Sequence, residues 1–241
     1  GQMITNKYIE KLKDFIDFKP ICPEVEIGMG TPRAPIRVIN VKDEMTLYQE
    51  ETKKDFTKKM NTFSDNYLSK TREVDGFILK SKSPSCGIGT AKVYSQKNPA
   101  PIGKGSGLFA SKVIDSFPHH PKEDEKHLNN PFLREHFFTS IFTIADFNSV
   151  TNINSLYKYH AKHKYLFMSY NQTQMRKMGK IAANEIKDVT KVVLENYYNS
   201  LLILLSKRAR YTSNINTHMH VMGYFKKRIS DKEKNHFLQL L

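Results

Sequence analysis

The sequence holds two cysteines, Cys22 and Cys86, whose thiols could take part in redox chemistry or bind a metal. Each follows a short apolar run, residues 18–21 and 76–79, and each is followed at once by turn-forming residues. That pattern is typical of a strand that ends at a turn. If the two strands are parallel neighbours, both thiols lie at the carboxyl edge of the sheet, where open α/β sheets bind ligands. We therefore expect the two thiols at one site.

The spacing of the cysteines leaves several kinds of chemistry open. A redox pair, half of a metal site, part of an iron–sulfur site and two buried thiols without a chemical role all fit. The sequence has no Cys-x-x-Cys motif, which weakens the redox reading. Two thiolates are too few for a cubane cluster unless a further cysteine lies outside this sequence.

Other candidate motifs are weaker. The pairs His160/His163 and His218/His220 have no acidic residue or cysteine at zinc-motif spacing, so we expect core or surface histidines. Residues 103–107, Gly-Lys-Gly-Ser-Gly, more often form a flexible turn than a phosphate cradle. Arg33 follows a glycine-containing loop and is as suited to holding an anion as to an ordinary surface position.

The composition predicts a protein without a membrane span. Hydrophobic residues make up 39% of the chain, and no apolar run approaches the roughly 20 residues needed to cross a bilayer. Residues 4–18 mix charges into their apolar positions, unlike a signal peptide. With two cysteines and no disulfide framework, we expect a soluble, cytoplasmic protein, and the sequence leaves its oligomeric state open.

The positive charge is unevenly distributed along the chain. The formal net charge is +14, of which +3 lies in residues 1–125 and +11 in residues 126–241. Such an excess predicts a polyanionic partner such as a nucleic acid, although a basic surface also serves solubility. Basic clusters in the second half have tyrosines and histidines between them, as suits contact with phosphates and bases.

The first half alternates between predicted helices and strands. We expect helices over residues 4–17, 46–70 and 108–117, and strands over residues 18–22, 36–39, 76–80 and 92–94. This alternation predicts an α/β domain with a small, mostly parallel sheet over residues 1–120.

The second half is predicted to be helical. Residues 118–131 are rich in charge and in helix breakers, which favours a linker at the start of a second domain, 121–241. Helical periodicity follows over residues 132–147, 152–168, 171–186, 188–206, 215–227 and 230–241. We therefore expect an all-α bundle.

Several short motifs resemble known families. Cys22-Pro23-Glu24, residues 30–33 (Gly-Thr-Pro-Arg), 76–80, 83–87 (Ser-Pro-Ser-Cys-Gly) and 105–110 resemble the TudS-type thiouracil desulfidases. Residues 133–137, 159–168 and 220–227 resemble the YbgA-type domain. The motifs occur in order over nearly the whole chain, and the joined arrangement resembles the RudS-type desulfidases of 4-thiouridine in tRNA.

The resemblance implies a site and its chemistry. It implies a [4Fe-4S] cluster held by Cys22, Cys86 and a third cysteine upstream of Gly1, with one iron left open for the sulfur of the base. It also implies Glu24 as acid/base and Ser83, with Ser85, as substrate-positioning residues. An open iron can take up sulfide and polarise the thiocarbonyl carbon for attack by water.

The remaining site predictions concern RNA. We expect phosphate contacts beside the extruded base from Lys80, Lys82 and Arg33. Further contacts are expected from the helical half, at Lys162, Lys164, Arg176, Lys226, Lys227 and Arg228. Two other functions stay open: a desulfidase of free thiouracil or thionucleosides, and a non-catalytic RNA-binding protein with structural cysteines.

Overall fold

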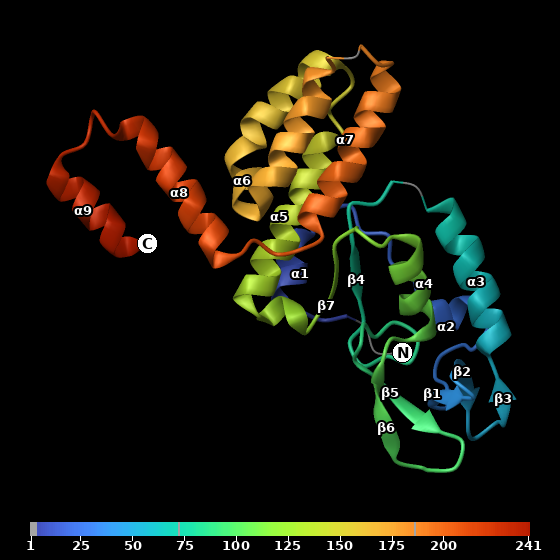
Figure 1. The fold of residues 1–241 in the computed structure, drawn as a ribbon. Coiled ribbons are helices and arrows are strands. Elements are labelled where there is room, and N and C mark those ends of the chain that lie inside the picture. The colour runs from blue at the N-terminus through green and yellow to red at the C-terminus, as the bar shows by residue number, and fades with distance from the viewer. Residues whose placement is uncertain (1–3, 72, 186) are drawn as a thin grey trace. The chain divides into compact units, whose positions relative to one another are not determined.

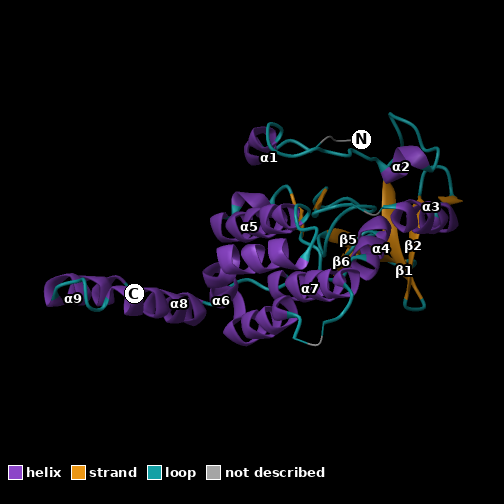
Figure 2. Ribbon diagram, turned by 90° about the horizontal axis from the view of Figure 1, so that it is seen from above, coloured by secondary structure: helices purple, strands orange, loops and turns teal. Residues whose placement is uncertain are grey.

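The computed structural model describes residues 4–71, 73–185 and 187–241. The chain divides into two compact units, residues 1–138 and 139–241, and each is described by itself. Strands occur in the first unit, and the second is helical over its described residues (Figure 2). The predicted order, an α/β part followed by a helical part, is confirmed.

The larger sheet of the first unit has five strands and is mixed (Figure 1). Its strands, in spatial order, are β3 (Lys54–Asp55), β2 (Glu44–Gln49), β1 (Ile36–Val41), β5 (Ala91–Ser95) and β6 (Pro101–Gly105). β1 and β5 run parallel, whereas β1/β2, β2/β3 and β5/β6 are antiparallel. The sheet therefore contains one parallel pair and three antiparallel pairs, so it is mixed rather than mostly parallel.

One of those hairpins replaces the first half of the long helix predicted over residues 46–70. Lys42 and Asp43 both have positive φ, 50° and 67°, which is the geometry of a two-residue hairpin turn. The polar sequence gives no Asn-Gly or Asp-Gly signal for such a turn, so the hairpin was missed. The helix itself, α3 (Thr57–Lys70), occupies the second half of the predicted range.

A second, two-stranded sheet pairs β4 (Phe77–Leu79) in parallel with β7 (Lys122–Asp124). The predicted linker, residues 118–131, therefore contains a strand, followed by the short 3-10 helix η1 (His127–Asn129). The prediction of a linker was wrong because β7 is only three residues long and charged, and it pairs with a distant strand.

The remaining helices of this unit are short. α1 (Lys7–Leu12) is shorter than the predicted helix, α2 (Pro23–Glu26) begins directly after Cys22, and α4 (Leu108–Ser116) matches its prediction. Helices α3 and α4 share a core with one face of the large sheet, through Val38, Leu47 and Val93. These helices thus cover one side of the sheet.

The second unit is built on helices that bury large apolar side chains. Its helices are α5 (Pro131–Phe147, which begins in the first unit), α6 (Ile153–Ala183), α7 (Thr190–Leu205), α8 (Tyr211–Phe225) and α9 (Asp231–Leu240). α5, α6 and α7 contribute Ile144, Phe167 and Leu201 to one core. The predicted break between residues 168 and 171 is present as a kink in α6, where Asn171 leaves helical geometry and its side chain accepts the N–H of Gln174 at 2.9 Å.

The last two helices bury little of their surface. α8 buries Thr217, and α9 has no buried residue, although a capping box between Ser230 and Glu233 stabilises its start. In the described part of the chain no helix combines the length and the apolar character that a bilayer span requires.

Candidate active site

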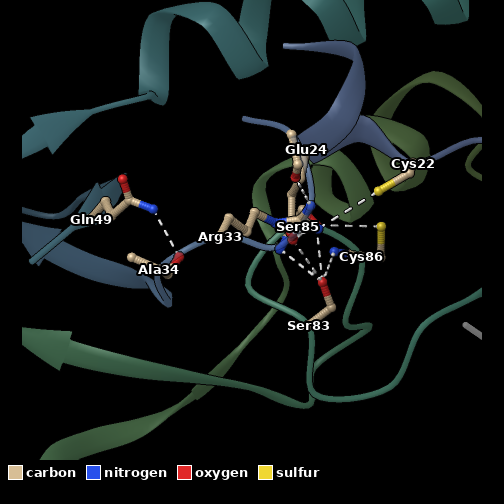
Figure 3. Close-up of polar contacts among 9 residues, drawn as sticks. Cys22, Glu24, Arg33, Ala34, Gln49, Ser83, Ser85 and Cys86 are labelled. Atoms are coloured by element: carbon tan, nitrogen blue, oxygen red, sulfur yellow. Dashed lines mark hydrogen bonds and ion pairs between the residues drawn. The ribbon is translucent and has the colours of Figure 1, made fainter. Parts of the chain in front are cut away.

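Cys22 and Cys86 lie at the start of α2 and in the loop after β4, and both are half-buried free thiols. The strand predicted to end at Cys22 is absent, because residues 18–22 form no ladder and β4 pairs with β7. The two segments meet through side chains instead: Ser85 Oγ donates a hydrogen bond to Glu24 Oε1 at 2.7 Å. In Figure 3 both sulfur atoms lie on the same side of Glu24 and Arg33.

The loop that carries Cys86 is shaped by the hydroxyl of Ser83. Ser83 Oγ accepts the backbone N–H groups of Ser85 and Cys86 at 3.2 and 3.1 Å, and Ser83 O accepts the N–H of Gly87 at 2.8 Å. Because the Ser85 proton goes to Glu24, the 2.9 Å contact between the hydroxyls has Ser83 as donor. Ser83 therefore organises the loop, and Ser85 is the hydroxyl in close contact with the carboxylate.

Backbone hydrogen bonds join the start of α4 to the loop that carries Cys86. The N–H groups of Leu108 and Ala110 donate to the carbonyl oxygens of Pro84 and Ser85 at 3.2 and 3.0 Å. Such a close approach requires Gly107, since a Cβ there would lie 2.4 Å from the carbonyl carbon of Ser85. The glycine-rich run predicted as a flexible turn thus supplies strand β6 and a tight backbone contact beside the site.

Glu24 is held by an arginine on its second oxygen. Arg33 Nε donates to Glu24 Oε2 at 2.7 Å and Arg33 Nη2 forms an ion pair with the same oxygen, with side chains 10% and 11% exposed. Arg33 Nη1 donates to Gly30 O at 2.6 Å, and Nη2 lies 3.8 Å from Cys22 Sγ. The carboxylate is thereby fixed between Arg33 and Ser85 (Figure 3).

This pairing gives Arg33 a different setting from the one expected. Its guanidinium is nearly buried and engages Glu24, so the geometry does not support a phosphate contact by this residue.

Gln49 contacts the segment that carries Arg33. Its buried side-chain amide donates a hydrogen bond to Ala34 O at 2.8 Å. Nothing in the sequence marks Gln49, because the contact depends on the hairpin that the sequence did not reveal.

Burial raises the pKa of the Cys86 thiol to about 12. The contact with the Ser85 hydroxyl opposes this rise, whereas the nearby Glu24 and Cys22 add to it. A thiol in such surroundings is protonated near neutral pH, unlike the low-pKa cysteines that act as free nucleophiles. A bound metal would deprotonate it, because a coordinating thiol ionises outright.

The donor set fits part of an iron–sulfur site. Two soft thiols face one site, and thiolates are the ligands that such clusters take. Within residues 4–71, 73–185 and 187–241, no three His, Cys, Asp or Glu side chains are grouped to hold a metal ion. Cys22 and Cys86 therefore fit two ligands of a cluster, and a third would come from elsewhere.

Lys80 is also held by a buried carboxylate. Lys80 Nζ lies 2.8 Å from Glu125 Oε1, and the N–H of Ser81 donates to Glu125 Oε2 at 2.7 Å. Burial raises the pKa of Glu125, but the hydrogen bonds from Lys80 and Ser81 outweigh it, and the net shift is downward. Glu125 thus fixes the start of the Cys86 loop. The sequence did not indicate this role, because Glu125 lies within the predicted linker.

Lys82, another of the residues expected to contact RNA, is exposed and has a φ of 61°.

The other predicted RNA-contacting residues belong to the second unit. Lys162 forms an ion pair with Asp146 at 2.8 Å. Lys164, Arg176, Lys226, Lys227 and Arg228 are exposed. The structure brings residues 226–228 together at the turn between α8 and α9, and the RNA-binding role of all these residues stays a prediction.

The histidines of the second unit have polar partners of their own. His163 Nε2 lies 2.7 Å from Asp146 Oδ2, and the His163 hydrogen bond, followed by that of Lys162, holds the pKa of Asp146 below its usual value. His160 Nδ1 lies 2.9 Å from the hydroxyl of the buried Tyr197. These contacts tie α5, α6 and α7 together.

Comparison with known proteins matches both halves of the chain. A family model described as 2-thiouracil desulfurase matches residues 1–125, and one described as a protein of unknown function (DUF1722) matches residues 164–241. The uncharacterized protein YbgA of Escherichia coli (strain K12) is 32% identical over 91 residues, which are 36% of this chain and 52% of YbgA. The chain thus spans about half the length of that relative. No solved structure matches. The resemblance to thiouracil desulfidases joined to a YbgA-type domain is confirmed.

Proposed function

We propose a function from one premise: this chain belongs to the 2-thiouracil desulfurase family, whose model matches its first 125 residues. Membership makes it an enzyme of the desulfurase type. The finer proposal is that it converts 4-thiouridine in tRNA to uridine and releases the sulfur as sulfide. The observation that carries this proposal is the Ser85–Glu24 hydrogen bond of 2.7 Å, which places a buried carboxylate beside both cysteines.

The proposed cofactor is a [4Fe-4S] cluster bound by Cys22, Cys86 and a third cysteine outside this sequence. When bound, such a cluster supplies an iron that takes the thiocarbonyl sulfur and makes the attached carbon more electrophilic. The half-buried setting of both thiols supports this assignment.

The chain's own residues activate the water. Glu24 Oε1 takes a proton from the attacking water, directly or through Ser85 Oγ at 2.7 Å. A C–O bond forms at the thiocarbonyl carbon, the C–S bond breaks, and the sulfur leaves with protons as hydrogen sulfide. Oxygen replaces sulfur without a change of oxidation state, so the reaction needs no reductant.

Arg33 and Ser83 position these groups. Two guanidinium contacts to Oε2 hold the Glu24 carboxylate in one orientation, which leaves Oε1 for proton transfer. Ser83 donates to Ser85 and fixes the loop that bears Cys86. Pre-organised groups of this kind need not reorient during the reaction.

The proposed partner is tRNA because of the charge of the second half. Residues 126–241 carry a net charge of +11, and Lys226, Lys227 and Arg228 are exposed together. Counterion release from an RNA backbone would favour binding there. The matched family's description names 2-thiouracil, which favours a free base as the second candidate substrate.

The test is anaerobic reconstitution, with iron and sulfide, of a form of the protein that contains the proposed third cysteine ligand. We expect a coloured protein that releases sulfide from 4-thiouridine-containing tRNA, and loss of colour and activity in Cys22→Ala and Cys86→Ala. Matched assays on free 2-thiouracil and 4-thiouridine decide between the substrates. A colourless, inactive protein that still binds RNA would contradict the proposal and leave the RNA-binding alternative.

A further inference from the structure

We propose that the face of the five-stranded sheet opposite α3 and α4 is a second RNA-docking surface, which guides the RNA strand that carries the thiolated base into the active site. This inference rests on the proposed tRNA substrate. We call this face, with Arg37, Tyr48, Lys92, Tyr94 and Lys104, the outer face. None of these residues belongs to the RNA contacts expected from the sequence.

Strand register assigns residues to the two faces. Val38 pairs with Leu47 on one side and with Val93 on the other, and all three are buried in the core shared with α3 and α4. Side chains alternate along a strand, so the neighbours of these residues point to the opposite face. The pairs Arg37/Tyr48 and Lys92/Lys104, together with Tyr94, therefore share the outer face.

The outer face combines cations with aromatic rings. The Arg37 guanidinium carbon lies 4.8 Å from the centre of the Tyr94 ring, and Tyr48 is directly opposite Arg37. Lys92 and Lys104 are exposed and face each other across β5 and β6. Among the described residues, none of the three cations forms an ion pair with a carboxylate.

Uncompensated like charges need an explanation. Two lysines directly opposite each other on a sheet repel and destabilise it. A polyanion would reverse the sign of that interaction, and a guanidinium supported by a tyrosine ring is a plane on which bases stack. Cations that meet phosphates beside planes that meet bases fit a single RNA strand.

The outer face ends at the active site. β1 and β5 run parallel, and their first residues follow Arg33 and Cys86 shortly in the chain, so both strands begin beside the site. Arg37 and Lys92 are each the second residue of their strands. Lys82 lies there too, since its N–H donates to Thr90 Oγ1 at 3.0 Å. An RNA strand on this face would therefore approach Glu24 and Cys86.

Protection of an exposed edge does not account for this arrangement. Lysines on an edge strand discourage aggregation, which would explain Lys104 on β6. Arg37, however, lies on β1, the central strand, where no edge needs protection. Two acidic residues share this face: Glu44 lies at the other end of β2, and Asp55, on the edge strand β3 beside Tyr48, accepts the N–H of Thr57 at 2.7 Å and forms no ion pair with Arg37.

The test compares the full chain with the variant Lys92→Gln/Lys104→Gln. The probes are unmodified tRNA and a short oligouridylate, so that no desulfidase activity is needed. We expect the Kd for both probes to rise about tenfold, and the slope of log K against log salt to fall by about 1 to 2. Thermal stability should stay the same or rise, because the repelling pair is gone.

The matched control is Lys58→Gln/Lys59→Gln. These exposed lysines open α3, directly after β3 at the other edge of the sheet, and their loss should leave Kd unchanged. Ultraviolet crosslinking adds a positional readout, with RNA expected on the peptide that contains Tyr94. Unchanged RNA affinity in the Lys92/Lys104 variant, or crosslinks confined to residues 139–241, would overturn the inference even if the desulfidase activity is established. Loss of RNA affinity in a chain that proves inactive on thiolated tRNA would uphold the docking surface and reject only the reaction.

Discussion

Two groups of cations, one in each unit, differ in what they contact. In the first unit Arg33 and Lys80 pair with the buried carboxylates Glu24 and Glu125. In the second unit residues 226–228 expose three cations at a helix turn. A buried pair fixes the position of a reacting group, whereas an exposed cluster attracts a distant polyanion. Net charge alone therefore does not tell which lysines and arginines bind RNA.

The largest effect is expected from Glu24→Gln, which removes the proposed base. We expect sulfide release to fall by about 10²–10⁴, the usual contribution of general acid–base catalysis, with the RNA Kd unchanged. Single-turnover assays on thiolated tRNA and RNA titrations measure the two quantities. A parallel loss of RNA affinity would show that the site and the RNA-binding surfaces are not separate.

Arg33→Met tests whether this arginine acts through Glu24. We expect a roughly 10- to 100-fold lower kcat. We also expect a loss of about 3–5 kcal/mol in the free energy of unfolding, because an unpaired carboxylate stays buried. The double variant Arg33→Met/Glu24→Met should recover much of that stability. The matched control is Arg37→Met, which should leave turnover of free 4-thiouridine unchanged; an equal loss in both variants would contradict the positioning role.

Glu125→Gln tests the second buried pair through its pH dependence. The pKa of Glu125 is lowered in the folded protein, so the unfolded chain binds more protons as the pH falls. The stabilisation is thus complete above the ordinary value of 4.5 and is lost below it. We expect the variant to be less stable by about 1–3 kcal/mol at pH 7.

The difference in the free energy of unfolding between Glu125→Gln and the native chain should shrink in acid. Urea unfolding at pH 7 and at a pH below 4.5 measures this difference. Glu50→Gln is the control, because Glu50 forms an exposed pair with Lys53, and its loss should change stability little. A Glu125→Gln variant with native stability at pH 7 would show that the pair does not hold the Cys86 loop.

The smallest effect on chemistry is expected from neutralising Lys226, Lys227 and Arg228 together. RNA affinity should fall and its salt dependence should weaken by about 2 to 3 units of slope, whereas turnover of a free thionucleoside should not change. Combined with the Lys92/Lys104 variant, the losses in log Kd should add if both surfaces contact RNA. Equal losses on tRNA and nucleoside would count against a separate RNA-binding role.

The sequence by itself determined the features that local patterns encode. The α/β and helical halves, the break in α6 near Asn171 and the start of α4 follow from periodicity and turn residues. The convergence of Cys22, Glu24 and Cys86 was also predicted, although through a pair of strands that does not exist.

Only the tertiary structure decided how the site is held together. The hairpin at Lys42–Asp43, the pairing of β4 with β7 and the contacts of Arg33 and Lys80 join residues whose sequences carry no signal for one another. The same holds for the outer face, whose residues come from four strands and share a side only through their register. Side chains reveal their secondary-structure preference locally, but a charge or a strand takes its partner from whatever the fold brings near, and that choice depends on the whole chain.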